Sequence, residues 1–148
     1  MEPKGEWDKM PLGYQFKLIN DKFIKKRNEQ LKEQELTFSQ SKLLVYIWHH
    51  NPQYLTQKEL CEGIHVSHPT MIGILKRLYE KGYISRTENP ENRRMHLIVL
   101  TEKAKDYLRN DRESLADRDR LLVQGMSPEE IRQLRQLLGK VYENMAGF

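Results

Sequence analysis

Two short segments with a strand-like pattern interrupt a sequence whose apolar residues otherwise recur at helical spacing. Tyr83–Thr87 and Met95–Leu100 are rich in β-branched and large apolar residues, and the polar, turn-forming stretch Glu88–Arg94 lies between them. Two such runs around a polar loop predict a β-hairpin. The predicted fold class is therefore mainly α with one small β-hairpin (α+β).

Helix-start signals divide the sequence before the hairpin into four predicted helices. Apolar residues at offsets of three and four predict a long amphipathic helix over residues 12–35. Thr37 and Thr56 each stand three residues before a Gln or Glu, which is the spacing of a capping box, and so begin the second and third helices. Ser67 begins the fourth helix, which Gly82 ends.

Two more helices are predicted after the hairpin. Thr101 caps a helix whose apolar residues continue to Leu115, and a capping box at Ser127 begins the last helix. At 148 residues the chain has the length of one domain. Within that domain, 1–148, we expect a compact lobe over residues 36–104 and a helical dimerisation region over residues 10–35 and 105–148.

Composition narrows the class of protein. No apolar run approaches the roughly 18–20 residues needed to cross a bilayer, and Met1–Asp8 lacks a hydrophobic signal core. We therefore expect a cytoplasmic protein without a membrane partner. A lone Cys61 excludes an internal disulfide. The formal charge of +4 permits a polyanionic partner but does not establish one.

The sequence offers no catalytic, cofactor-binding or metal-binding motif. It has neither a glycine-rich phosphate loop nor a GxSxG nucleophile motif, so we predict that the protein is not an enzyme. The histidines do not have the HExxH spacing of a zinc site, and we predict no cofactor and no metal. They are His49, His50, His65, His68 and His96.

Two short helices around the turn Gly63–Val66, followed at once by a hairpin, have the plan of a winged helix-turn-helix. From Leu36 to Ala104 the sequence also resembles the multiple-antibiotic-resistance regulator (MarR) family, whose dimerisation helices the flanking helices match. The segments that carry this resemblance are Leu55–Leu60, Val66–Thr70, Leu75–Ile84, Asn92–Arg94 and Leu100–Ala104. The resemblance covers nearly the whole chain.

The resemblance implies a homodimeric, DNA-binding regulator of transcription, by default a repressor. The helix from Ser67 to Lys81 would enter the major groove of double-stranded DNA, and the Glu88–Arg94 loop would reach the minor groove. The predicted DNA-binding residues are Ser67, His68, Pro69, Thr70, Gly73, Lys76, Arg77, Arg93 and Arg94. The alternative for these residues is a solvated helix face and a plain charged turn.

The sequence departs from the family pattern at the two places where DNA contact is expected. Asn92 stands where members usually carry an acid, so a salt bridge that shapes the wing is expected to be absent. Ile72 and Gly73 stand where many members have polar, groove-facing residues, which leaves fewer hydrogen bonds to bases.

Three further expectations follow. The resemblance implies a small aromatic effector between the lobe and the dimer helices; candidate lining residues, which at helical spacing are more often core residues, are Tyr14, Phe16, Trp48 and Tyr107. Cys61 is interpreted as an inert residue on the buried side of a short helix rather than as an oxidant sensor.

The rival function is a winged-helix module for protein–protein assembly, which has no need of Arg93 on an extended wing.

Overall fold

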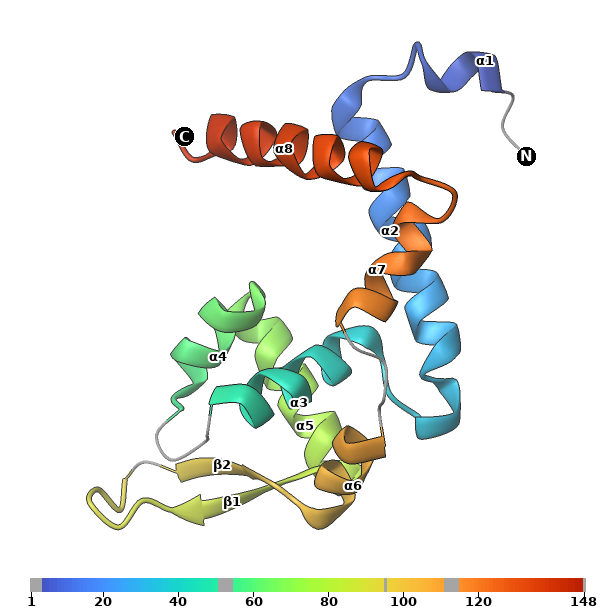
Figure 1. Ribbon diagram of the computed structural model, residues 1–148. Coiled ribbons are helices and arrows are strands. Elements are labelled where there is room, and N and C mark those ends of the chain that lie inside the picture. The colour runs from blue at the N-terminus through green and yellow to red at the C-terminus, as the bar shows by residue number, and fades with distance from the viewer. Residues whose placement is uncertain (1–3, 51–54, 95, 111–114, 148) are drawn as a thin grey trace. The chain divides into compact units, whose positions relative to one another are not determined.

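The computed structural model describes residues 4–50, 55–94, 96–110 and 115–147. Figure 1 shows the elements in chain order, and the predicted mainly helical fold with one antiparallel hairpin is confirmed. The elements are α1 (Lys4–Trp7), α2 (Leu12–Gln30), the 3-10 helix η1 (Lys32–Gln34), α3 (Phe38–His50), α4 (Gln57–Ile64), α5 (His68–Glu80), β1 (Ile84–Glu88), β2 (His96–Leu100), α6 (Glu102–Asn110), α7 (Leu115–Val123) and α8 (Pro128–Met145).

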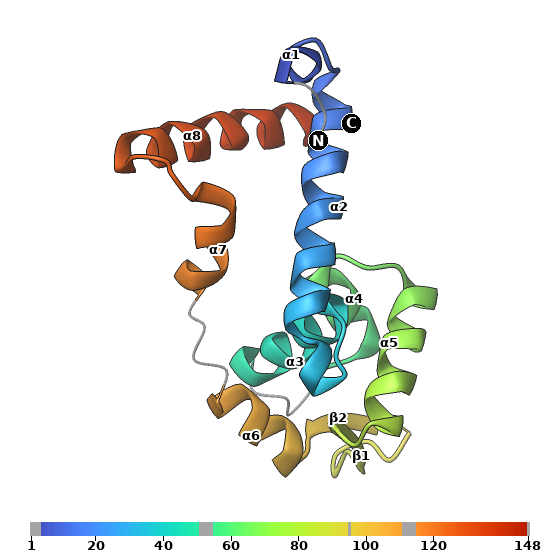
Figure 2. The ribbon, with the colours of Figure 1, turned by 90° about the vertical axis from the view of Figure 1, so that its right-hand side faces the viewer.

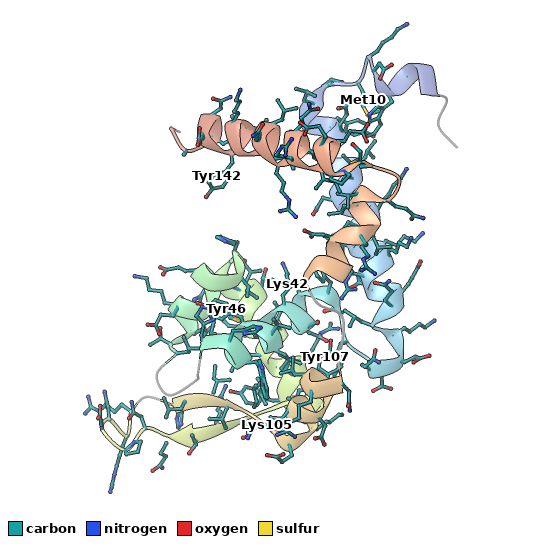
Figure 3. The ribbon with its side chains drawn as sticks, viewed as in Figure 1. Met10, Lys42, Tyr46, Lys105, Tyr107 and Tyr142 are labelled. Carbon is teal, nitrogen blue, oxygen red and sulfur yellow. The ribbon has the colours of Figure 1, made fainter. Side chains whose placement is uncertain are left out.

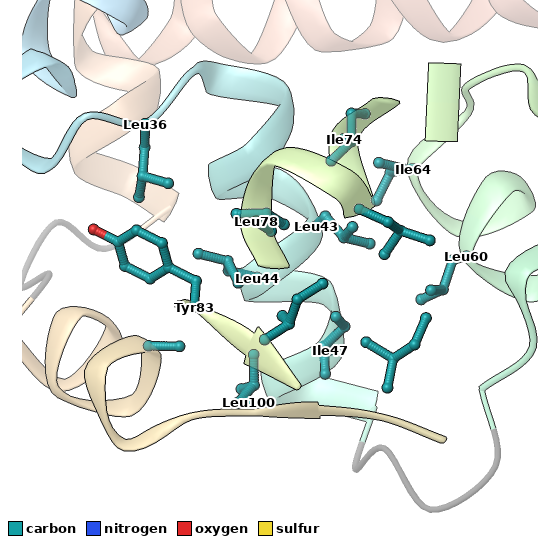
Figure 4. Packing of buried hydrophobic residues seen from close by; sticks show 14 of the residues in the cluster. Leu36, Leu43, Leu44, Ile47, Leu60, Ile64, Ile74, Leu78, Tyr83 and Leu100 are labelled. Atoms are coloured by element: carbon teal, nitrogen blue, oxygen red, sulfur yellow. The ribbon is translucent and has the colours of Figure 1, made fainter. Parts of the chain in front are cut away.

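The chain divides into two compact units, residues 1–111 and 112–148. In the first unit, α3 is the central element of the core, because it contacts α2, α4, α5, α6 and β2. Its apolar side chains Leu43, Leu44 and Ile47 are fully buried. Figure 4 shows them among apolar residues from the neighbouring helices and from the hairpin.

The hairpin is anchored at its base and free at its tip. Ile84 pairs with Leu100 at the base, and both side chains are buried, whereas Glu88 pairs with His96 near the tip, and both are exposed. The base therefore belongs to the core of the first unit. The remainder projects from it as a wing (Figure 1).

The structure corrects the single helix predicted over residues 12–35. Helix α2 ends at Gln30, a turn of 3-10 helix follows, and Glu35 adopts a left-handed backbone with φ of 54°. This turn lets Leu31 and Leu36 both enter the core, since each is about 95% buried. The burial of these two leucines in the core therefore explains why α2 ends at Gln30.

The predicted helix from Thr101 through Leu115 is described only in part, because residues 111–114 lie outside the described residues. Helix α6 ends at Asn110, and α7 begins at Leu115 in the second unit. In that unit the predicted capping box at Ser127 is confirmed at the start of α8, and the guanidinium of Arg135 on α8 lies 2.9 Å from the carboxylate of Asp119 on α7. None of the helices in the described parts of the chain is long and apolar enough to span a bilayer.

Candidate nucleic-acid interface

Helix α5 begins at a serine cap and carries no acid in its first turn. The backbone N–H of Thr70 donates to Ser67 Oγ at 3.4 Å, and the hydroxyls of the two residues share a hydrogen bond of 2.9 Å. The first N–H groups of a helix carry partial positive charge and attract anions. With no carboxylate of its own in the first turn, this helix start suits a phosphate group.

The two faces of α5 divide as the sequence predicted. Its core-facing side chains are Met71, Ile74, Leu75 and Leu78, all buried. Exposed residues are His68, Pro69, Thr70, Gly73, Lys76 and Arg77. One exposed helix face therefore holds two cationic side chains and a helix start without an acid. Contact of these residues with DNA stays a prediction.

Helix α4, which precedes α5, packs closely on α3 at Gly63. A Cβ atom at Gly63 would lie only 2.2 Å from Cζ of Tyr46, so the Tyr46 ring occupies the space that a side chain would need. Figure 3 labels Tyr46 on α3. The ring also stacks on His50, with a centroid distance of 3.9 Å. The turn to α5 follows His65, whose φ is 54°.

The wing turn is shaped by two asparagine side chains. Oδ1 of Asn89, a buried residue, accepts the backbone N–H of Glu91 at 2.9 Å, and Oδ1 of Asn92 accepts the backbone N–H of Arg94 at 3.1 Å. In the described part of the wing, Asn92 thus bonds to backbone where the family places an acid. Arg93 and Arg94 are both exposed at the tip.

An arginine that sequence reasoning missed connects the wing to α5. The guanidinium of Arg86 on β1 lies 4.8 Å from the centroid of the Tyr79 ring on α5, within the range of a cation–π contact. Figure 2 shows α5 running towards the hairpin. Strand alternation could have indicated this position, because Arg86 lies two residues after buried Ile84 and its side chain is therefore on the same face of the strand.

Polar contacts also fix the base of the wing to the turn between α2 and α3. Lys81 Nζ donates to the carbonyl oxygen of Glu35 and to Oε1 of Gln40. The Tyr83 hydroxyl donates to the carbonyl oxygen of Gln34 at 2.9 Å. Burial raises the pKa of the Tyr83 phenol, so the hydroxyl keeps its proton and remains a donor.

Cys61 is half-buried rather than fully buried. Its Sγ lies 3.9 Å from Nδ1 of His68, the first residue of α5. The predicted inertness of the thiol stays a prediction. In the described ranges, no three His, Cys, Asp or Glu side chains gather as a metal site.

The four aromatic residues considered for an effector site do not share one environment. Tyr107, labelled in Figure 3, packs against the core of the first unit, and its hydroxyl lies 2.9 Å from Ser41 Oγ. Tyr14, Phe16 and Trp48 are exposed. An open hollow of about 430 Å³ along α2 is lined by other residues, namely Asp21, Ile24, Lys25, Asn28, Glu29 and Lys32.

Comparison with known proteins gives consistent matches. Residues 36–96 match the sequence model of the MarR family. The fold is similar to S. aureus MepR in a complex with DNA, with a TM-score of 0.81 and 24% identity over 91% of this chain and 98% of that chain. A mutant MarR from E. coli complexed with operator DNA gives a TM-score of 0.76 and 28% identity over 90% and 95%.

The transcriptional regulator SlyA matches with a TM-score of 0.73 and 27% identity over 93% of this chain and 96% of that chain. The matched segment 36–96 contains α3, α4, α5 and β1, so it includes the paired helices and the wing loop described above. The structural matches extend over nearly the whole chain, including the flanking helices. Together these findings show that the chain is similar to the MarR family of transcriptional regulators, by sequence over residues 36–96 and by fold over nearly its whole length.

Proposed function

We propose that this protein is a cytoplasmic, homodimeric repressor that binds a palindromic operator in double-stranded DNA. The observation that carries the proposal is the exposed face of α5, with Lys76 and Arg77 on it and no acid in its first turn, in the same unit as a wing that ends in two exposed arginines. Related proteins that share this fold have been crystallised with DNA.

Each part of this face has a matching feature in duplex DNA. The start of α5 at Ser67 offers N–H groups to a phosphate, and the exposed middle of the helix enters the major groove. Arg93 and Arg94 reach into the flanking minor groove, where the electrostatic potential is most negative in A·T-rich tracts. A two-fold dimer then requires half-sites about 34–36 Å apart, one helical turn.

Dimerisation is supported by apolar side chains that each unit leaves in solvent. Leu12 on α2 is 68% exposed, and Leu137 on α8 is 59% exposed. Phe16, Ile19 and Leu138 are exposed as well, and Leu134 and Val141 are half-buried. We propose that the apolar side chains of α2 and those of α8 pack together across a two-fold axis, which removes them from solvent. The interface should exceed about 2,000 Å², the area that an obligate dimer buries. Light scattering at micromolar concentration should give twice 17.7 kDa; a folded monomer contradicts the dimer.

A salt series on DNA tests the function directly. The ligands are a duplex that the wild type selects from a randomised pool and a random duplex of equal length. Log affinity should fall with log salt at a slope of about −0.9 per phosphate neutralised. Arg93→Ala should weaken binding most at A·T-rich flanks, whereas Thr70→Ala should alter preference within the half-site and leave the slope nearly unchanged.

Arg109→Ala is the matched control, because it removes the same charge from an exposed position on α6. It should bind both duplexes nearly as the wild type does. If Arg93→Ala binds every duplex like the wild type, the wing is not a DNA contact, and the alternative of an assembly module gains.

A further inference from the structure

One residue on the exposed face of α5 does not fit a surface made for polar contacts alone. Ile72 is 54% exposed, although four apolar residues of the same helix are buried in the core, namely Met71, Ile74, Leu75 and Leu78. It lies one helical turn from His68 on one side and from Lys76 on the other, and both of these are exposed. The exposed side chain of Ile72 thus lies between a histidine and a lysine.

The next residue, Gly73, keeps the surface beside Ile72 low. A Cβ atom at Gly73 would meet nothing within 4 Å, so packing within the chain does not require a glycine there. Glycine inside a helix costs about 1 kcal/mol relative to alanine. A glycine at an unconstrained exposed position allows another molecule to approach the helix backbone closely, and that approach brings Ile72 with it.

Hydrogen-bonding groups are scarce at this part of the helix. The hydroxyl of Thr70 is already bonded to that of Ser67 at 2.9 Å, and Ile72 and Gly73 have no polar side-chain atom. In the major groove, the 5-methyl group of thymine is the one base feature that an apolar side chain recognises. The composition of the face therefore suits methyl contact better than hydrogen bonding to base edges.

We propose that Ile72 is a specificity-determining residue that reads thymine through its 5-methyl group; this inference rests on the proposed DNA-binding function. The cationic neighbours Lys76 and Arg77 favour DNA over an apolar protein surface as the partner of Ile72, because both would lose hydration without a counter-charge at a protein core.

The test removes single methyl groups from the DNA. A duplex selected by the wild type from a randomised pool is remade with deoxyuridine in place of each thymidine in turn, which keeps base pairing and deletes only the methyl group. At one or two positions in each half-site the wild type should bind about fourfold more weakly, the effect of one buried methyl-sized group.

Two substitutions of Ile72 separate methyl contact from other effects. Ile72→Ala should bind thymidine and deoxyuridine duplexes equally at those positions, and Ile72→Val, which keeps a branched apolar side chain, should retain most of the preference. The side chain is exposed, so both variants should melt within a few degrees of the wild type. Their melting curves verify that a change in binding does not arise from unfolding.

The outcomes distinguish failure of this inference from failure of the function. If the wild type selects a duplex but tolerates deoxyuridine everywhere, or if Ile72→Ala keeps the preference for thymidine, the inference is wrong and the DNA-binding function stands. If the wild type selects no duplex from the pool, the proposed function is wrong, and the inference is wrong with it.

Discussion

Helices α4 and α5 pack against each other, but they differ in the charge of the first turn and in the space around their glycine. In α4 the side chains of Thr56 and Glu59 form a complete capping box, so the acid neutralises the helix start. Helix α5 has a serine cap, but the equivalent position is Thr70 and no acid stands in the first turn. Gly63 in α4 is pressed against Tyr46, whereas Gly73 in α5 faces open space.

This difference separates residues that are explained by contacts within the chain from residues whose explanation requires a binding partner. The capping acid Glu59 and the glycine Gly63 of α4 are each explained by a contact within the chain. The corresponding residues of α5 have no such explanation: its helix start lacks a counter-charge, its glycine lacks a neighbour, and an isoleucine stands in solvent. Each of these features is explained if α5 is the helix that meets DNA.

The strongest test gives α5 the first turn of α4. Thr70→Glu supplies the missing acid of a capping box, which should raise the free energy of unfolding by about 0.5–1 kcal/mol. The same carboxylate should repel a phosphate at the helix start and weaken DNA binding by about 100-fold. Urea unfolding and a DNA titration measure the two effects. An increase in stability without loss of affinity would show that no phosphate binds there.

The next test places a methyl group on the closed glycine. Gly63→Ala forces the Tyr46 ring from its stack on His50, and we expect the free energy of unfolding to fall by about 1–3 kcal/mol. Tyr46→Leu in the same chain should recover part of the loss, because the smaller side chain leaves room for the new Cβ. Additive losses in the double variant would mean that the two residues do not compete for space.

The same substitution on the open glycine should have the opposite effect on stability. Gly73→Ala meets no atom within 4 Å, so higher helix propensity should raise the free energy of unfolding by up to about 1 kcal/mol. DNA binding should nevertheless weaken by about tenfold, since the added Cβ would overpack a close approach. Unchanged affinity would show that the α5 backbone does not lie close to the duplex.

A smaller effect concerns the acid that α4 has and α5 lacks. The hydrogen bond from the Thr56 backbone N–H lowers the pKa of the Glu59 carboxyl below its usual range. The stabilisation is therefore complete above the ordinary carboxyl pKa and is lost as the pH falls through the lowered value. Glu59→Ala should melt below the wild type at neutral pH, and the two melting temperatures should converge in acid.

The smallest expected effect is at Cys61, a residue of α4 whose thiol lies beside His68 of α5. Cys61→Ser should leave DNA binding and its response to peroxide unchanged, because the thiol has no second cysteine in its own chain. A wild type that loses DNA binding in peroxide beside an insensitive Cys61→Ser variant would contradict this, and an intersubunit or mixed disulfide would then be sought.

What the sequence could predict depends on how local the signals are. The caps at Thr56, Ser67 and Ser127 were predictable because donor and acceptor lie within one helical turn. The end of α2 was not, since it depends on core space for Leu31 and Leu36.

The candidate site shows the same division. The exposed face of α5 follows from helical periodicity, which also gave its buried residues. The contact of Arg86 with Tyr79 joins a strand to a helix, and the close packing of Gly63 on Tyr46 joins α4 to α3. Neither distance is encoded by spacing along one element, so both required the three-dimensional structure.

Because asparagine side chains hold the wing turn, the salt dependence of DNA binding has a simple interpretation in this protein. The backbone hydrogen bonds that the neutral side-chain amides of Asn89 and Asn92 accept through Oδ1 are not weakened by ionic screening, and amides do not titrate. A wing tip closed by an ion pair would change its conformational equilibrium as salt is added, and that change would be mixed into the measured slope. Here the tip should keep one shape throughout the series. The slope then counts only the ions released from DNA, and the difference between wild type and Arg93→Ala becomes a direct count of the phosphate charge that one arginine neutralises.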